Sequence, residues 1–151
     1  MEKVKQSSQL RQHAISLLAR REHAYFELQR KLLAKGYASL DIDAVLTELV
    51  QERLQSDRRY CELFVRFRFE KGHGPYRIRM ELQERRVDDA LIQEFLYSGE
   101  QDWYQLALDV RKKRFGLEPI NDIKERAKQQ RFLQYRGFST EQINAAMQQQ
   151  D

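Results

Sequence analysis

Residues 130–138 read Gln130-Arg131-Phe132-Leu133-Gln134-Tyr135-Arg136-Gly137-Phe138, with a leucine placed four residues before a glycine. The same spacing occurs twice earlier in the chain, where Leu32 stands four residues before Gly36 and Leu82 four residues before Arg86. These three marks, at residues 36, 86 and 137, are 50 and 51 residues apart. A recurrence at this period indicates a supersecondary unit that is repeated three times.

Apolar residues also recur at fixed distances after each mark. An isoleucine follows six residues later and a leucine or methionine four residues after that: Ile42 and Leu46, Ile92 and Leu96, Ile143 and Met147. A unit of about fifty residues buries too little apolar surface to be stable alone, so neighbouring units are expected to share a core. The sequence therefore predicts an all-α fold of three tandem three-helix repeats, residues 1–54, 55–100 and 101–151, packed into an elongated, curved array.

Glycine and proline mark the expected helix ends. The chain has only six glycines and two prolines, and glycine commonly ends helices while proline opens them. This punctuation predicts nine helices, over residues 8–21, 24–35, 39–53, 57–71, 75–86, 88–98, 101–115, 121–136 and 139–149. Ser39, Asp57, Asp88 and Ser139 are expected to cap helix N-termini. Most aromatic residues, including Phe64, Phe67, Phe115 and Phe132, are expected in the core rather than as platforms for stacked bases.

Charge is distributed unevenly along the chain, although the net charge is only +4. Residues 58–86 hold nine Lys and Arg against four Glu, residues 88–109 hold six acids and no Lys or Arg, and residues 111–136 hold nine bases against three acids. This segregation fits a surface that binds a polyanion. It fits equally a set of solvated helix faces.

The candidate binding residues come from the two basic segments and rest on charge alone. They are Arg66, Arg68, Arg77, Arg79, Arg85, Arg86, Arg111, Lys112, Lys113, Arg114, Lys124 and Lys128. On the expected helix 75–86, Arg79 and Arg86 nearly coincide, and Arg77 and Arg85 lie about 80° apart, which makes two basic ridges. These arginines would bind phosphate or an acidic protein surface, or simply solubilise the helix and pair with the acids of 88–109.

No catalytic motif can be recognised in the sequence. Phosphate-binding loops, dinucleotide fingerprints, nucleophile elbows and zinc-protease helices are missing. The closest pattern is Gly72-His73-Gly74-Pro75, which could approach a phosphate but is better explained as a turn between two helices. We therefore expect a protein that is not an enzyme, without a cofactor or a small-molecule substrate.

The cysteine and histidine content predicts no metal site. Cys61 is alone, and His13, His23 and His73 are scattered without a second ligand at metal-binding spacing. A single cysteine fits a reducing compartment. The sequence has no run of about 18 apolar residues and no signal peptide at its start, so we expect a cytoplasmic protein that does not associate with membranes.

Several motifs together resemble the RecX family of bacterial regulators of the RecA recombinase. They are Arg21 through Leu28 and Leu32 to Gly36, Asp57-Arg58-Arg59-Tyr60, Gly72-His73-Gly74-Pro75-Tyr76-Arg77-Ile78-Arg79 with Glu81-Leu82, Asp102-Trp103, and the stretch 130–138 quoted above. The resemblance covers nearly the whole chain. It implies three three-helix repeats that lie along the RecA–DNA filament and limit its growth, its ATP hydrolysis and its strand exchange.

The chain departs from the family pattern at two positions. The family usually has glycine where this chain has Arg53 and Arg86. A left-handed arginine costs on the order of 1 kcal/mol, so these two helix ends are expected to terminate differently. The family motifs are mostly helix-ending and packing residues, and they supply no binding site.

Three functions are compatible with these observations. The first is a regulator, presumed monomeric, whose partners are the RecA filament and, weakly and without sequence preference, single- and double-stranded DNA. The second is a plain sequence-nonspecific DNA-binding protein that neutralises phosphates with its basic segments. The third is an enzyme with an unrecognised site, which requires a concave cluster of titratable groups.

The repeat alignment predicts that its apolar columns lie in the core. Leu133→Asp should then bury an unpaired carboxylate and lower the free energy of unfolding by several kcal/mol. Leu32→Asp and Leu82→Asp should behave alike. The measurement is thermal melting followed by circular dichroism, and an unchanged melting temperature for any of the three would place that column on the surface.

Overall fold

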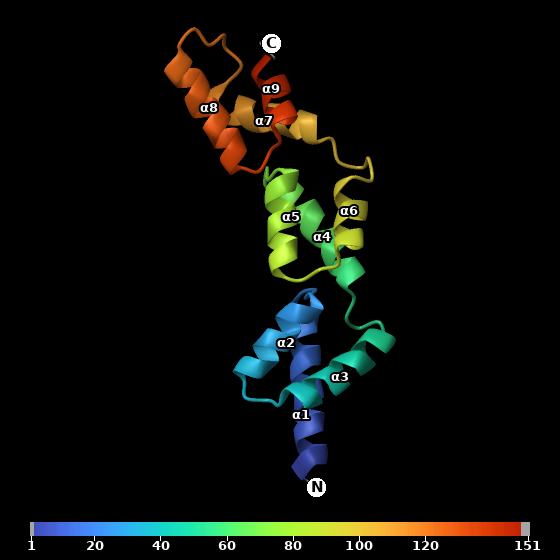
Figure 1. Cartoon of the computed structure of the whole chain (residues 1–151). Coiled ribbons are helices and arrows are strands. Elements are labelled where there is room, and N and C mark those ends of the chain that lie inside the picture. Colours follow the sequence, from blue (N-terminus) through green and yellow to red (C-terminus); the bar gives the residue numbers. More distant parts are fainter. Residues whose placement is uncertain (1, 149–151) are drawn as a thin grey trace. The chain divides into compact units, whose positions relative to one another are not determined.

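The computed structural model describes residues 2–148, which form nine α-helices and no strand (Figure 1). The helices are α1 (Glu2–Arg20), α2 (Tyr25–Ala34), α3 (Ser39–Gln51), α4 (Asp57–Glu70), α5 (Pro75–Glu84), α6 (Asp89–Leu96), α7 (Trp103–Phe115), α8 (Ile123–Tyr135) and α9 (Thr140–Gln148). Each predicted helix is present. The largest difference is at α1, which begins six residues earlier than expected.

These helices form two compact units. The first holds the residues up to Leu63 together with Gln83–Leu91, and the second holds Phe64–Leu82 together with the residues from Ile92 onward. The boundary passes through α4, α5 and α6. The middle repeat therefore contributes to the cores of both units.

The apolar columns of the repeat lie in the core, as the alignment predicts. In the first unit, Leu32, Ile42 and Leu46 are fully buried in one cluster with residues of α1, α2 and α3. In the second, Leu133, Ile143 and Met147 occupy the equivalent places. The remaining members, Leu82, Ile92 and Leu96, are buried as well. All nine positions are thus interior, which confirms the three-helix repeat.

The three repeat marks share one backbone conformation. Gly36, Arg86 and Gly137 have φ angles of 96°, 54° and 100°, and the N–H of each donates to the carbonyl three residues before it. The expectation that Arg53 and Arg86 would end their helices differently is wrong, because both adopt the left-handed conformation, Arg53 with φ 62°. The guanidinium of Arg86 lies 4.5 Å from the centre of the Phe26 ring, a contact that offsets part of the strain.

Two glycine turns meet in the second unit. The N–H of Gly74 donates to the carbonyl of Arg136 at 2.7 Å, and the N–H of Tyr76 donates to the carbonyl of Gly137 at 2.9 Å. A Cβ on Gly74 would lie 2.4 Å from the carbonyl carbon of Gly137, and a Cβ on Gly137 would lie 2.4 Å from the Cβ of Arg77. The predicted turn at 72–75 is therefore also a docking point, where the first N–H groups of α5 meet carbonyls at the end of α8.

Helix capping agrees only partly with the sequence. Ser139 forms the expected cap, since its hydroxyl accepts from the N–H of Gln142 while the Gln142 side chain accepts from the N–H of Ser139. Ser39 and Asp57 are instead the first helical residues of α3 and α4. Ser56 takes the cap of α4, with its Oγ accepting from the N–H of Arg59 at 3.1 Å.

Candidate nucleic-acid interface

The twelve predicted binding residues divide by exposure. Arg66, Arg86, Lys112, Lys113, Arg114, Lys124 and Lys128 are exposed; Arg68, Arg77, Arg79 and Arg85 are half-buried; Arg111 is buried. Arg85 and Arg86 belong to the first unit and the other ten to the second. The predicted set therefore mixes residues of both units, and one of its members is buried.

Arg111 is a core residue and not a surface contact. Only 1% of it is exposed, and its Nε donates to Oε1 of Gln129 at 2.9 Å while Nη1 donates to the carbonyl of Ala146 at 3.0 Å. Burial lowers the pKa of Arg111, and the charge of Arg126 lowers it further. The side chain thus joins α7 to α8 and α9. Trp103 and Ala107, also buried, precede it at intervals of four, and this periodicity could have placed it in the core.

Arg68 and Arg77 are engaged inside the second unit. Their guanidinium groups lie 3.3 and 3.6 Å from the carboxylate of Glu81. His73 approaches the same carboxylate, with Nδ1 at 3.9 Å. Glu81 lies on α5 itself, so this pairing of Arg77 is within its own helix and outside the acidic segment 88–109.

The expected pair of ridges on one helix is also wrong. Helix α5 ends at Glu84, so Arg85 and Arg86 lie in the turn that follows it. Arg85 approaches Glu27, with its Nε 3.9 Å from the carboxylate, and Arg86 lies over Phe26. Only two of the four arginines, Arg77 and Arg79, remain on the helix.

A basic groove runs beside α7 and α8, and three of its six cations, Lys71, Arg131 and Arg136, are not among the predicted residues. One part, about 570 Å³, is lined by Arg114, Phe115, Lys128, Arg131, Phe132, Gln134 and Tyr135. An adjoining part, about 370 Å³, shares Arg114 and Phe132 and adds Lys71, Lys113 and Arg136 with two acids, Glu70 and Asp109. The stretch 130–138 supplies Arg131, Phe132 and Arg136 to this groove. The sequence alone assigns this stretch to helix ends and packing, so it does not predict the groove.

The aromatic residues are less buried than the sequence suggested. Phe67 is 56% exposed and Tyr135 is 77% exposed, while Phe64, Phe115 and Phe132 are half-buried. Phe115 and Phe132 pack edge to face with ring centres 5.3 Å apart. The guanidinium groups of Arg114 and Arg136 lie 5.6 and 5.2 Å from the centre of the Phe132 ring.

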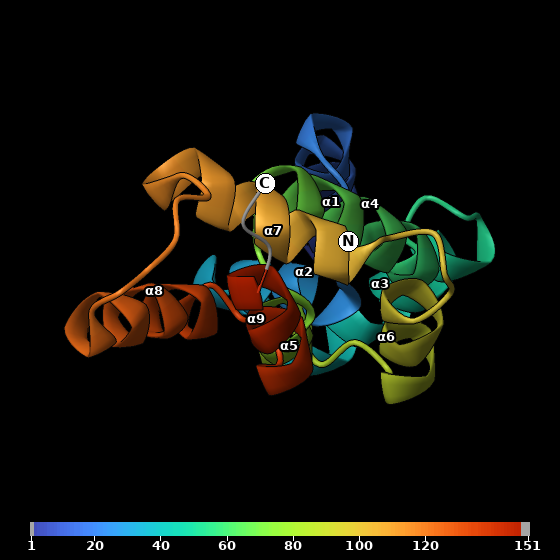
Figure 2. The same cartoon turned by 90° about the horizontal axis from the view of Figure 1, so that it is seen from above.

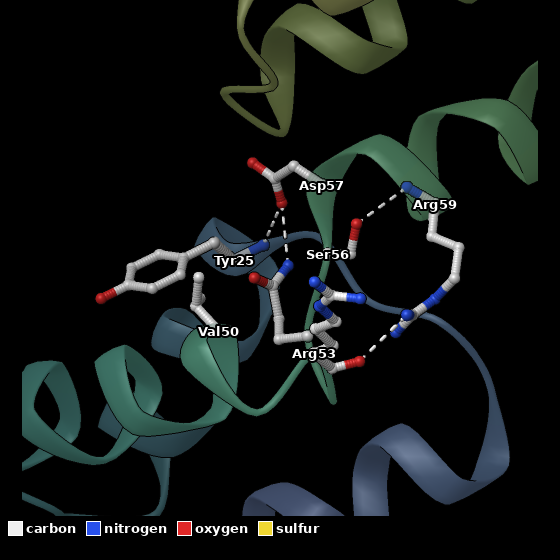
Figure 3. A pocket seen from close by; sticks show the side chains of 7 residues that line it. Tyr25, Val50, Arg53, Ser56, Asp57 and Arg59 are labelled. Atoms are coloured by element: carbon white, nitrogen blue, oxygen red, sulfur yellow. Dashed lines mark hydrogen bonds between the residues drawn. The ribbon is translucent and has the colours of Figure 1, made fainter.

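A pocket of about 510 Å³ in the first unit is built from structural contacts (Figure 3). Asp57 accepts from the N–H of Tyr25 at 2.8 Å and from Nε2 of Gln55 at 2.9 Å. Arg59 donates to the carbonyl of Arg53 at 3.0 Å and pairs with Glu22 at 2.6 Å. These bonds join the start of α2 to the start of α4, so the polar lining of the pocket is largely occupied by the fold itself.

The described part of the chain contains no group of three His, Cys, Asp or Glu that could hold a metal ion. Cys61 is buried, and its sulfur lies 3.8 Å from the carbonyl of Leu91. None of the helices between residues 2 and 148 has the length and apolar character required to span a membrane.

Three family models match the chain in succession. They describe the first, second and third three-helix domains of RecX, at residues 11–49, 56–96 and 100–147. The chain belongs to the RecX family. A RecX of Vibrio vulnificus, named a regulatory protein, is 44% identical over 89% of this chain and 88% of its own length. The regulatory protein RecX of Chromohalobacter salexigens is 46% identical over 91% and 90%.

A solved RecX structure has the same fold. The crystal structure of RecX from Lactobacillus salivarius superposes with a TM-score of 0.80 over 96% of each chain, at 20% sequence identity. The fold of the family is therefore kept at low identity, as expected when apolar columns and turns carry it.

His73 is expected to remain neutral well below its usual pKa. Burial lowers the pKa of this imidazole to about 4, and Arg77, Arg68, Arg136 and Lys71 lower it in that order. Because the unfolded state binds a proton near pH 6.5 and the folded state does not, His73 should make the protein less stable as pH falls from about 6.5 to about 4. An NMR titration of the His73 imidazole measures its pKa in the folded protein directly. A midpoint between pH 6 and 7 would contradict the lowered pKa.

Proposed function

We propose that the chain binds the RecA recombinase filament on DNA and limits filament growth, ATP hydrolysis and strand exchange. The observation that carries the proposal is membership of the RecX family across all three domains, whose curated members are named regulatory proteins. The chain acts by binding and not by catalysis. The basic groove beside α7 and α8 supplies a surface for a partner that carries phosphate.

Tandem repeats suit a filament as a partner. The three domains share one three-helix pattern, so successive repeats can touch successive subunits or phosphates. Contacts that are weak one by one then add through effective concentration, and no single deep pocket is required.

Sequence-nonspecific DNA binding is the second candidate, and the cations of the groove favour it. A protein of this kind holds bare DNA as well as recombinase-coated DNA, and its affinity falls steeply with salt as counterions are released. A filament regulator prefers the coated form. The two functions therefore separate in one binding assay with both substrates.

The proposed function predicts that substoichiometric amounts of the chain progressively slow ATP hydrolysis by a recombinase on single-stranded DNA. The exposed cations Lys112, Lys113 and Arg114 in the last turn of α7 are expected to contribute to this inhibition. Replacing all three by Glu should raise the concentration needed for half-inhibition at least about tenfold, because each change turns an attraction to phosphate into a repulsion.

The control changes the same charge in the first unit, by replacing the exposed Arg20, Arg30 and Lys35 with Glu. This variant should inhibit more strongly than the α7 variant. Circular dichroism checks that both are folded. A wild-type chain that binds bare and coated DNA equally and leaves the hydrolysis rate unchanged would refute the filament function.

A further inference from the structure

The groove beside α7 and α8 lies within the second unit, where contacts between the two helices fix its walls. Figure 2 shows α8 standing apart from α7 and joined to it by a long connection. The two helices are bridged by the bond from Arg111 to Gln129 and by the packing of Phe115 against Phe132. Side chains of both helices line the two adjoining parts of the groove.

The lining is strongly cationic. Six cations, Lys71, Lys113, Arg114, Lys128, Arg131 and Arg136, face the groove with only two acids. Arg114 and Arg136 are held in place against the Phe132 ring, and Nη1 of Arg136 also donates to the carbonyl of Lys71 at 3.1 Å. Cations fixed in this way bind an anion with less loss of side-chain entropy than mobile ones.

Burial is the main reason for the low pKa of the nearby His73, and positive charges around it lower that pKa further. Two of the cations that disfavour its protonation, Arg136 and Lys71, also line the groove. A site with this potential attracts anions before contact is made.

An exposed aromatic ring borders the cations. Tyr135, at the end of α8, is 77% exposed and lines the larger part of the groove. Arg77 lies 5.7 Å from the centre of its ring. Bases stack on open aromatic rings beside a cationic track when they are not already stacked in a duplex. An acidic protein surface would use the cations and would not need the exposed ring.

We propose that this groove is a binding site for single-stranded DNA, with one base stacked on Tyr135 and the flanking phosphates held by Arg114, Lys128 and Arg131. The inference deepens the proposed function and rests on it in one respect: within a filament, the strand bound would be the recombinase's own DNA. Recognition is independent of sequence, because stacking and phosphate contacts are common to all nucleotides.

The test measures the affinity of the full chain for a fluorescently labelled oligothymidine and for a duplex of the same length. Tyr135→Ala should weaken binding of the single strand about tenfold, in line with the loss of one base stack, and change duplex binding less than about twofold. Tyr135→Phe keeps the ring and should bind like wild type. Tyr104→Ala, at another exposed tyrosine of the same unit, is the matched control and should have no effect.

The phosphate contacts are tested by salt dependence. The double variant Lys128→Gln, Arg131→Gln should make the slope of log affinity against log salt less negative by about 1.4, the value for two lost contacts to a single strand. Retained single-strand affinity in Tyr135→Ala would overturn the proposal. So would equal losses for strand and duplex, or Tyr135-dependent binding of polyglutamate as tight as that of the strand, which would make the groove a protein-binding site.

The outcomes separate this site from the proposed function. If Tyr135→Ala keeps full single-strand affinity while the wild-type chain slows recombinase ATP hydrolysis, the groove assignment is wrong and the function stands. If single-strand binding depends on Tyr135 but hydrolysis is unaffected by the wild-type chain, the groove assignment stands and the function is wrong.

Discussion

The second unit depends on the close approach of two backbone turns, at Gly74 and Gly137. Neither position has room for a Cβ, and the gap is closed by hydrogen bonds from Gly74 and Tyr76 to the carbonyls of Arg136 and Gly137. These bonds satisfy N–H groups at the start of α5 that would otherwise lack a partner inside the helix. The approach also fixes the end of α8 beside α5, and with it the position of Tyr135 next to Arg77.

Beside the apolar core of this unit, a buried polar contact joins α7 to α8. Of the thirteen residues of α8, the buried ones are Gln129 and Leu133, and Gln129 accepts a hydrogen bond from the buried Arg111. A buried guanidinium is costly unless its hydrogen bonds are satisfied. Because few residues of α8 face the core, its remaining side chains are available to form the basic groove, and the buried polar contact and the proposed binding surface have the same origin.

Sequence reasoning succeeded where a residue's role follows from spacing. The columns of Leu32, Leu82 and Leu133 and the turns that follow them are properties of a helical period, and the family resemblance reinforced them. A residue's role could not be predicted from the sequence where that role depends on which side of a helix meets a neighbour. Counting charge put Arg111 on the surface, although its neighbours four and eight residues earlier were candidates for the core.

Charge counting also could not show that Arg68 and Arg77 share Glu81, or that Lys71 and Arg136, 65 residues apart in the chain, line one groove.

The central claim, that backbone approach at Gly137 holds the second unit together, is tested by comparing Gly137→Ala with Gly36→Ala in urea unfolding. Both glycines have nearly the same φ angle, but a Cβ at Gly36 meets no atom within 4 Å. Each variant should lose about 1 kcal/mol to backbone strain, and Gly137→Ala should lose about 1–3 kcal/mol more from overpacking. Equal losses would contradict the account.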